Sequence, residues 1–128
     1  MNKWSIGILA GMVALAIALV SAPVGAAKDG DKLVRGTCTS GATSKLKLSE
    51  ENGRIEVEFE VDQNRNGVRW NVVIVQNGKR IARMSRVTKG PSGSFEARVV
   101  APNQPGTDKF TARATRASGA VCTARASF

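Results

Sequence analysis

The stretch RIEVEFEVDQNRNGVRWNVVIVQ, residues 54–76, decides the fold class. In its first part apolar and acidic residues alternate strictly, and successive side chains of a β-strand point to opposite faces. One row should therefore face a core while the glutamates face solvent; the core row is Ile55, Val57, Phe59 and Val61. The central DQNRNG is rich in residues that tolerate turn conformations, and the apolar alternation resumes after it. We interpret the segment as two strands joined by a turn.

The same alternation runs through most of the chain after residue 31, broken by turn signals such as Asn52-Gly53 and Asn77-Gly78. We expect no helix there and strands near residues 32–38, 43–49, 54–61, 68–76, 79–88, 94–100, 108–117 and 120–127. Two sheets closing on the apolar rows would form an all-β sandwich of antiparallel strands. The later rows expected to face its core are Trp70, Val72, Ile74, Phe95, Ala97, Val99, Phe110, Ala112, Ala114, Cys122, Ala124 and Ala126.

The segment APNQPGTDKFTARATRASGA, residues 101–120, carries a resemblance. It resembles the corner into the sixth strand of fibronectin type III and related bacterial immunoglobulin-like domains, through Pro105, Gly106, Thr107, Asp108 and Phe110. The chain is also similar to small, uncharacterised secreted bacterial proteins. The resemblance implies an immunoglobulin-like sandwich of 7–8 antiparallel strands, in which the segment holding Cys38 is an extra leading strand tied to the last one. These domains usually have Tyr where this chain has Phe110, so the hydroxyl-to-backbone bond of a tyrosine corner cannot form.

The first 27 residues have the pattern of a secretory signal peptide. One cation, Lys3, precedes an uncharged run that ends in small residues, and cleavage is expected after Ala26 or Ala27. No Cys follows, which disfavours a lipoprotein anchor, and an uncleaved N-terminal anchor is the alternative. Residues 28–128 would then be one secreted domain, extracellular or periplasmic, without a membrane span.

The chain has two cysteines, Cys38 and Cys122. Export would place both in an oxidising compartment, so we expect one disulfide between them. The chain has no His, and with both thiols paired a zinc site has no ligand set.

A calcium site is a weaker hypothesis for DQNRNG. Asp62, Asn64 and Asn66, followed by Gly67, match the first half of an EF-hand loop. The twelfth position of that loop needs a bidentate Glu and is Val73 here, the flanking segments are expected to be strands, and an Arg lies within the loop. We therefore favour a turn that crosses between the two sheets, and we expect no other metal and no cofactor.

Charge is unevenly distributed along this strongly basic chain, whose net charge is +9. Residues 63–128 hold twelve bases and two acids, whereas residues 50–62 hold six acids and one base. Such a surface attracts anionic polymers. The candidate polyanion-binding residues are Arg83, Arg86, Arg98, Arg113, Arg116 and Arg125. The alternative is that the bases provide solubility and in part pair across strands with Glu56, Glu58 and Glu60.

Catalysis has little support, because the chain has no His, no free thiol is expected and no Gly-x-Ser-x-Gly motif occurs. The scarcity of aromatic residues disfavours nucleic acid as the ligand. We predict a secreted, non-catalytic binding or adhesion module for anionic cell-surface polymers. The alternative function is a structural or inhibitory protein that binds another extracellular protein through its loops. The oligomeric state is left open.

Overall fold

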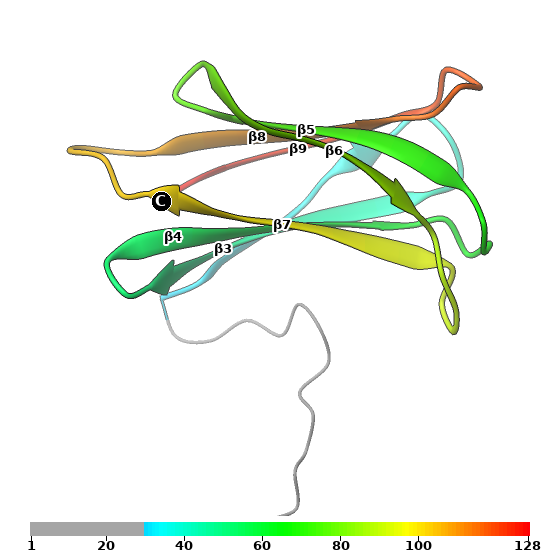
Figure 1. Ribbon diagram of the computed structural model, residues 1–128, viewed down its shortest axis with the longest axis horizontal. Helices are drawn as coiled ribbons and strands as arrows, with labels where there is room; N and C mark the ends of the chain where they lie inside the picture. Colours follow the sequence, from blue (N-terminus) through cyan, green and yellow to red (C-terminus); the bar gives the residue numbers. More distant parts are fainter. Residues whose placement is uncertain (1–29) are drawn as a thin grey trace, which may run out of the picture.

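A computed structural model describes residues 30–128, which form two antiparallel sheets packed face to face (Figure 1). The predicted signal peptide, its cleavage position and the uncleaved-anchor alternative lie outside the described residues. The strands are β1 (Lys32–Arg35), β2 (Thr37–Cys38), β3 (Thr43–Glu51), β4 (Arg54–Asp62), β5 (Arg69–Gln76), β6 (Lys79–Val87), β7 (Ser94–Pro102), β8 (Lys109–Thr115) and β9 (Val121–Ser127). Residues 30–128 contain no helix, and hence none long and apolar enough to cross a membrane. The predicted all-β sandwich is confirmed.

The strands divide into a four-stranded sheet of order β1-β3-β4-β7 and a five-stranded sheet of order β2-β9-β8-β5-β6. Asn52 and Asn77 both have a φ of 49° and are followed by glycines of positive φ. This conformation suits the two-residue turns of hairpins, and these turns join β3 to β4 and β5 to β6 within their sheets. The connection from β4 to β5 instead passes from one sheet to the other, as predicted for DQNRNG.

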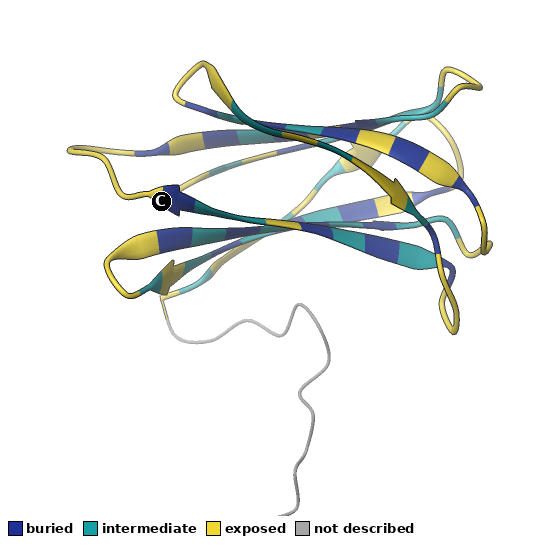
Figure 2. Ribbon diagram, in the orientation of Figure 1, coloured by how far each residue is buried: buried dark blue, intermediate teal, exposed yellow. Residues whose placement is uncertain are grey.

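The core lies between the sheets and follows the alternation expected from the sequence (Figure 2). The row from Ile55 to Val61 and the side chain of Trp70 have no exposed surface. Leu46 and Leu48 of β3 complete the four-stranded side of the core. Val99 points toward the core but is only partly buried, because β7 is the edge strand of its sheet.

The predicted strand at residues 32–38 is two strands, which is a correction to the sequence-based expectation. β1 pairs with β3 and β2 pairs with β9, so the chain changes sheets at Gly36. A Cβ atom at Gly36 would collide with the Ser44 hydroxyl and would lie 2.7 Å from the carbonyl oxygen of Thr123. Alternation reports which way side chains point and carries no information on which sheet a strand joins.

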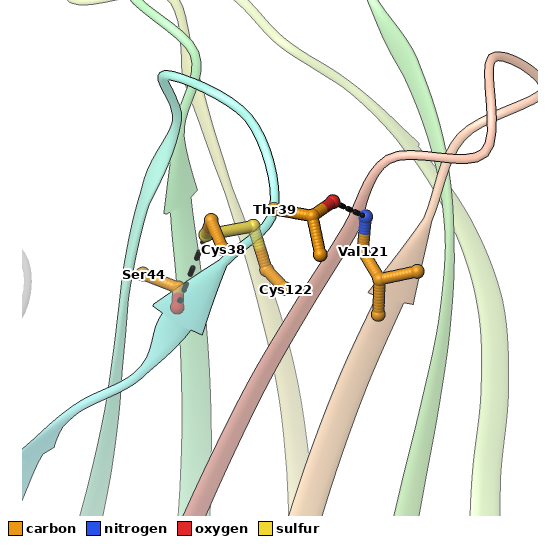
Figure 3. The surroundings of a disulfide bond; sticks show 5 residues. All are labelled: Cys38, Thr39, Ser44, Val121 and Cys122. Atoms are coloured by element: carbon orange, nitrogen blue, oxygen red, sulfur yellow. Dashed lines mark hydrogen bonds between the residues drawn. A yellow bond between two sulfur atoms is a disulfide. The ribbon is translucent and has the colours of Figure 1, made fainter.

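The predicted disulfide between Cys38 and Cys122 is present and joins β2 to β9; the two cysteines are separated by 84 positions in sequence (Figure 3). The Ser44 hydroxyl lies 3.6 Å from Sγ of Cys38. Beyond the bridge the Val121 amide donates to Oγ1 of Thr39 (3.0 Å), which continues the pairing of the two segments. The bridge therefore fastens the first part of the described chain to its last strand.

A buried carboxylate fixes the corner before β8, where the resemblance would have placed a tyrosine bond. Asp108 has no exposed surface, and its Oδ1 accepts hydrogen bonds from Nε2 of Gln76 (2.9 Å) and Nδ2 of Asn77 (3.1 Å). Its Oδ2 accepts from the backbone amide of Gln104 (3.1 Å). The backbone of Asp108 also exchanges two hydrogen bonds with Phe128, so the same corner holds the end of the chain.

Candidate functional site

The two sheets differ sharply in charge. The strands of the five-stranded sheet contain no acid and eight bases, which are Arg69, Lys79, Arg80, Arg83, Arg86, Lys109, Arg113 and Arg125. The strands of the four-stranded sheet contain seven acids and six bases. The uneven distribution along the sequence is therefore a division between two layers, and the five-stranded sheet is the cationic one.

Strand register gathers several of these bases on the outer surface of the five-stranded sheet. Residues directly opposite each other in paired strands point to the same face. Arg83 pairs with Val73, Val73 with Arg113, and Arg113 with Thr123, so these residues form one outward row across four strands. Residues that belong to this surface by the same criterion, here called the basic face, are Arg69, Arg80, Arg83, Lys109, Arg113 and Arg125.

A β-bulge contributes to this grouping. Arg80 and Arg83 are three residues apart, and a regular strand would place them on opposite faces. The register shifts between Ile74 and Val75, so that Arg80 lies opposite Val75 and Ala82 opposite Ile74. The extra residue in β6 thus brings Arg80 to the same face as Arg83.

The basic face has a half-buried floor and exposed cationic rims. Val73 and Val75 are half-buried, whereas Arg83 and Arg113 on the flanking strands are exposed. Since neighbouring strands lie about 4.8 Å apart, the attachment points of these two arginines are about 10 Å apart. A depression of about 420 Å³ lies over β8 and β9, and Lys109, Thr111, Arg125 and Ser127 are among the residues that line it. Within residues 30–128, no base of the basic face forms an ion pair.

Three of the six arginines proposed from the sequence, Arg83, Arg113 and Arg125, lie on the basic face. Arg98 lies on the other sheet, where its Nη2 contacts Oε2 of Glu56 (2.7 Å) and Oε2 of Glu51 (3.0 Å). Arg98 is thus neutralised locally and separate from the other three.

Arg116 and Arg86 lie on the core side of the five-stranded sheet. The guanidinium carbon of Arg116 is 5.6 Å from the centre of the Trp70 ring. The sequence already indicated this orientation. Arg116 continues the row of alternate residues that includes the buried Ala112 and Ala114, so its side chain points the same way. Arg86 lies opposite Trp70 on the edge strand, and its Nη1 donates to the carbonyl oxygen of Ser85 (2.9 Å).

Sequence reasoning missed three members of the basic face. Arg69 precedes the core residue Trp70 on its strand and could have been placed on the outer face by alternation. Lys109 has the same parity as Arg113 and could have been found from it. Arg80 could not, because the position of the bulge depends on how β5 and β6 pair.

The outer surface of the four-stranded sheet carries cross-strand ion pairs, as the alternative interpretation of the charges expects for the glutamates. Nζ of Lys47 lies 2.8 Å from Oε2 of Glu58, and Nζ of Lys45 lies 3.6 Å from Oε1 of Glu60. The glutamates are therefore paired mainly with bases of their own sheet. They do not neutralise the basic face.

Protonation of this surface is set by the same contacts. The hydrogen bond from Arg98, helped by contacts with Glu58 and Glu51, lowers the pKa of Glu56 to about 2. Burial raises the pKa of Glu58, and the neighbouring Glu56 raises this pKa further. Lys47 acts in the opposite direction and lowers it. Burial also raises the pKa of Glu96. The carboxylates are thus held in unequal environments.

The candidate calcium residues form a turn. The amide of Asn64 donates to Oδ1 of Asp62 (2.8 Å), and Asn64 has a φ of 53°. The amide of Gln63 donates to the carbonyl oxygen of Gly93 (3.0 Å), which ties the turn to the β6–β7 connection. In the described part of the chain, no three His, Cys, Asp or Glu residues gather as they would around a metal ion. Oδ1 of Asp62 thus serves the local backbone.

Comparison with protein-family models and with curated proteins finds no match to this chain. The case for a function therefore rests on the geometry of the chain itself.

Proposed function

We propose that the protein is a secreted, non-catalytic binding module that holds an anionic cell-surface polymer on its basic face. The observation that carries the proposal is the five-stranded sheet, whose strands contain no acid and whose register turns six bases outward. A linear polyanion that contacts several fixed cations releases its condensed counterions, which favours binding. The half-buried Val73 and Val75 between the cations would contact the uncharged parts of such a polymer.

Secretion and the immunoglobulin-like class belong to the same proposal. A disulfide is typical of oxidising compartments, which agrees with the signal-peptide pattern of residues 1–27. The passage of the chain between the sheets after β4, and the pairing of β2 with the last strand, are features that an immunoglobulin-like sandwich with an extra leading segment would have.

The test measures binding to dextran sulfate, a linear polyanion, over a series of salt concentrations. The face variant carries Arg113→Glu and Arg125→Glu. The control carries Lys32→Glu and Arg54→Glu, two exposed bases of the four-stranded sheet, so that both variants change the net charge equally. We expect the face variant to lose most binding at near-physiological salt while the control retains it.

The salt dependence gives a second readout. The slope of log affinity against log salt should fall in magnitude by about two in the face variant, one for each lost contact. Equal losses in both variants would mean that only net charge matters and would reject the basic face as a site. Binding that is insensitive to salt would also reject it, because contacts between fixed cations and a polyanion weaken as the salt concentration rises.

A further inference from the structure

Three arginines line one depression at the end of the sandwich where the β4–β5 and β6–β7 connections and the β8–β9 turn lie, on the right in Figure 1. Arg65 comes from the β4–β5 connection, Arg69 from the start of β5 and Arg116 from the residue after β8. The depression has a volume of about 290 Å³, and no acid lines it. Among residues 30–128, none of the three arginines forms an ion pair.

The core fixes the position of Arg116. Its guanidinium lies against the ring of the fully buried Trp70, a cation–π contact that orients the side chain. Its backbone closes the β8–β9 turn, because its amide donates to the carbonyl oxygen of Ala120 and its carbonyl accepts from Gly119, both at 3.0 Å. Arg116 is therefore held at the rim of the depression.

Arg65 and Arg69 are held through a buried threonine and a serine. The Thr88 hydroxyl donates to the carbonyl oxygen of Arg65 (2.6 Å) and accepts from the amide of Val68 (2.9 Å). Nη1 of Arg69 donates to Oγ of Ser85 (2.9 Å). The backbone that carries the two arginines is thus clamped to the end of β6.

We propose that Arg65, Arg69 and Arg116 bind a phosphate or sulfate monoester group. Three like charges beside one depression repel one another unless an anion lies between them. Guanidinium groups present planar pairs of donors that match the oxygens of such an anion. Two neutral side chains at the same depression, those of Asn66 and Ser118, can donate further hydrogen bonds.

The number of arginines favours a tetrahedral anion with three free oxygens over a carboxylate. A carboxylate offers two oxygens and one charge, and three arginines from separate segments exceed what it can satisfy. A phosphate or sulfate monoester offers three oxygens, and the phosphate also carries nearly two charges. This site takes a single anionic group at the end of the sheet, and it stands whether or not the basic face binds a polymer.

The test uses the fluorescence of Trp70, which Arg116 contacts directly. The chain has two tryptophans, so Trp4→Phe leaves Trp70 as the single reporter. The probes are inorganic phosphate, inorganic sulfate and glycerol 3-phosphate, each compared with sodium chloride and sodium acetate at equal ionic strength. Vesicles with and without phosphatidic acid show whether the same group is also recognised at a membrane surface. We expect a saturable response to the phosphates and sulfate and none to chloride.

Variants locate the site. Arg65→Gln and Arg69→Gln should each weaken phosphate binding about tenfold or more, because each removes charge-assisted hydrogen bonds. Both residues are exposed, so neither change disturbs the core as Arg116→Gln would. Arg125→Gln on the basic face is the matched control and should leave phosphate binding unchanged.

A response that does not saturate, that chloride reproduces, or that survives both arginine variants would overturn the proposal. The Arg113→Glu, Arg125→Glu protein should still bind phosphate after losing dextran sulfate. The small-anion site and the basic face can therefore fail independently.

Discussion

Removal of the disulfide by Cys38→Ala together with Cys122→Ala should lower stability by several kcal/mol. β2 has only two residues, and its pairing with β9 consists of the Thr37–Thr123 and Cys38–Cys122 positions. So short a strand contributes little pairing of its own. Without the covalent link, the leading segment is held to the five-stranded sheet mainly by this ladder and by the hydrogen bonds between Thr39 and Val121.

The magnitude follows from the length of the loop that the bridge closes. For two residues 84 positions apart, the loss of loop-closure entropy in the unfolded chain corresponds to about 4 to 5 kcal/mol at 25 °C. A domain of this size shifts its melting temperature by about 4 to 8 °C for each kcal/mol. The double variant should therefore melt roughly 16 to 40 °C lower. A loss of about 4 to 5 kcal/mol is a large part of the stability of an ordinary small domain.

Urea unfolding followed by Trp70 fluorescence measures this loss, with the unmodified protein under oxidising and reducing conditions as the control. Reduction leaves both sulfur atoms in place, so it separates the lost link from the lost packing of Cys122. The urea m value should rise in both cases, because the opened unfolded chain exposes more surface. A loss below about 1 kcal/mol with an unchanged m value would refute the loop-closure argument. Two titratable thiols in the native protein would refute the bridge itself.

Three further predictions concern the polar contacts. Asp108→Ala should cost about 2 to 3 kcal/mol in urea unfolding, because buried donors lose a charged acceptor; a cost below about 0.5 kcal/mol would contradict that role. Thr88→Val, which keeps the shape, should cost about 1 to 3 kcal/mol, since it leaves the Val68 amide and the Arg65 carbonyl without a partner; a neutral effect would show that the clamp is dispensable. The pKa of Glu56 is about 2 in the fold and about 4.3 when unfolded, so its contact with Arg98 stabilises the protein fully above about pH 4.5 and loses this effect as the pH falls toward 2. The stability difference between the protein and Arg98→Gln should accordingly shrink over that range, and a difference independent of pH would contradict the assignment.

Strand positions could be predicted well because they depend on local patterns. The expected strand at residues 54–61 is β4, extended by one residue, and the row it turns inward is fully buried. The disulfide followed from composition, since only two cysteines were available to pair. The crossing between sheets at DQNRNG also followed, although the Asx turn that shapes it became visible only in the structure.

Candidate binding residues were harder to predict, because their grouping depends on contacts between distant segments. Alternation along β7 correctly indicates that Arg98 points outward. No local feature of the sequence shows that its sheet also carries the acids with which it pairs. Alternation along β8 also indicates that Arg116 faces the core side, where it contacts Trp70 and lies apart from the basic face. The depression shared by Arg65, Arg69 and Arg116 has no sequence signature, since its members approach only when β4, β5 and β8 are in place.

The sequence by itself determined the strands, the direction of most side chains and the single possible disulfide, because backbone alternation and turn chemistry act over a few residues. The tertiary structure decided which strands share a sheet. Strand pairing is a long-range choice made by hydrogen bonds and core packing, and it separates eight bases from seven acids into two layers. The basic face and the arginine-lined depression exist only because of that choice.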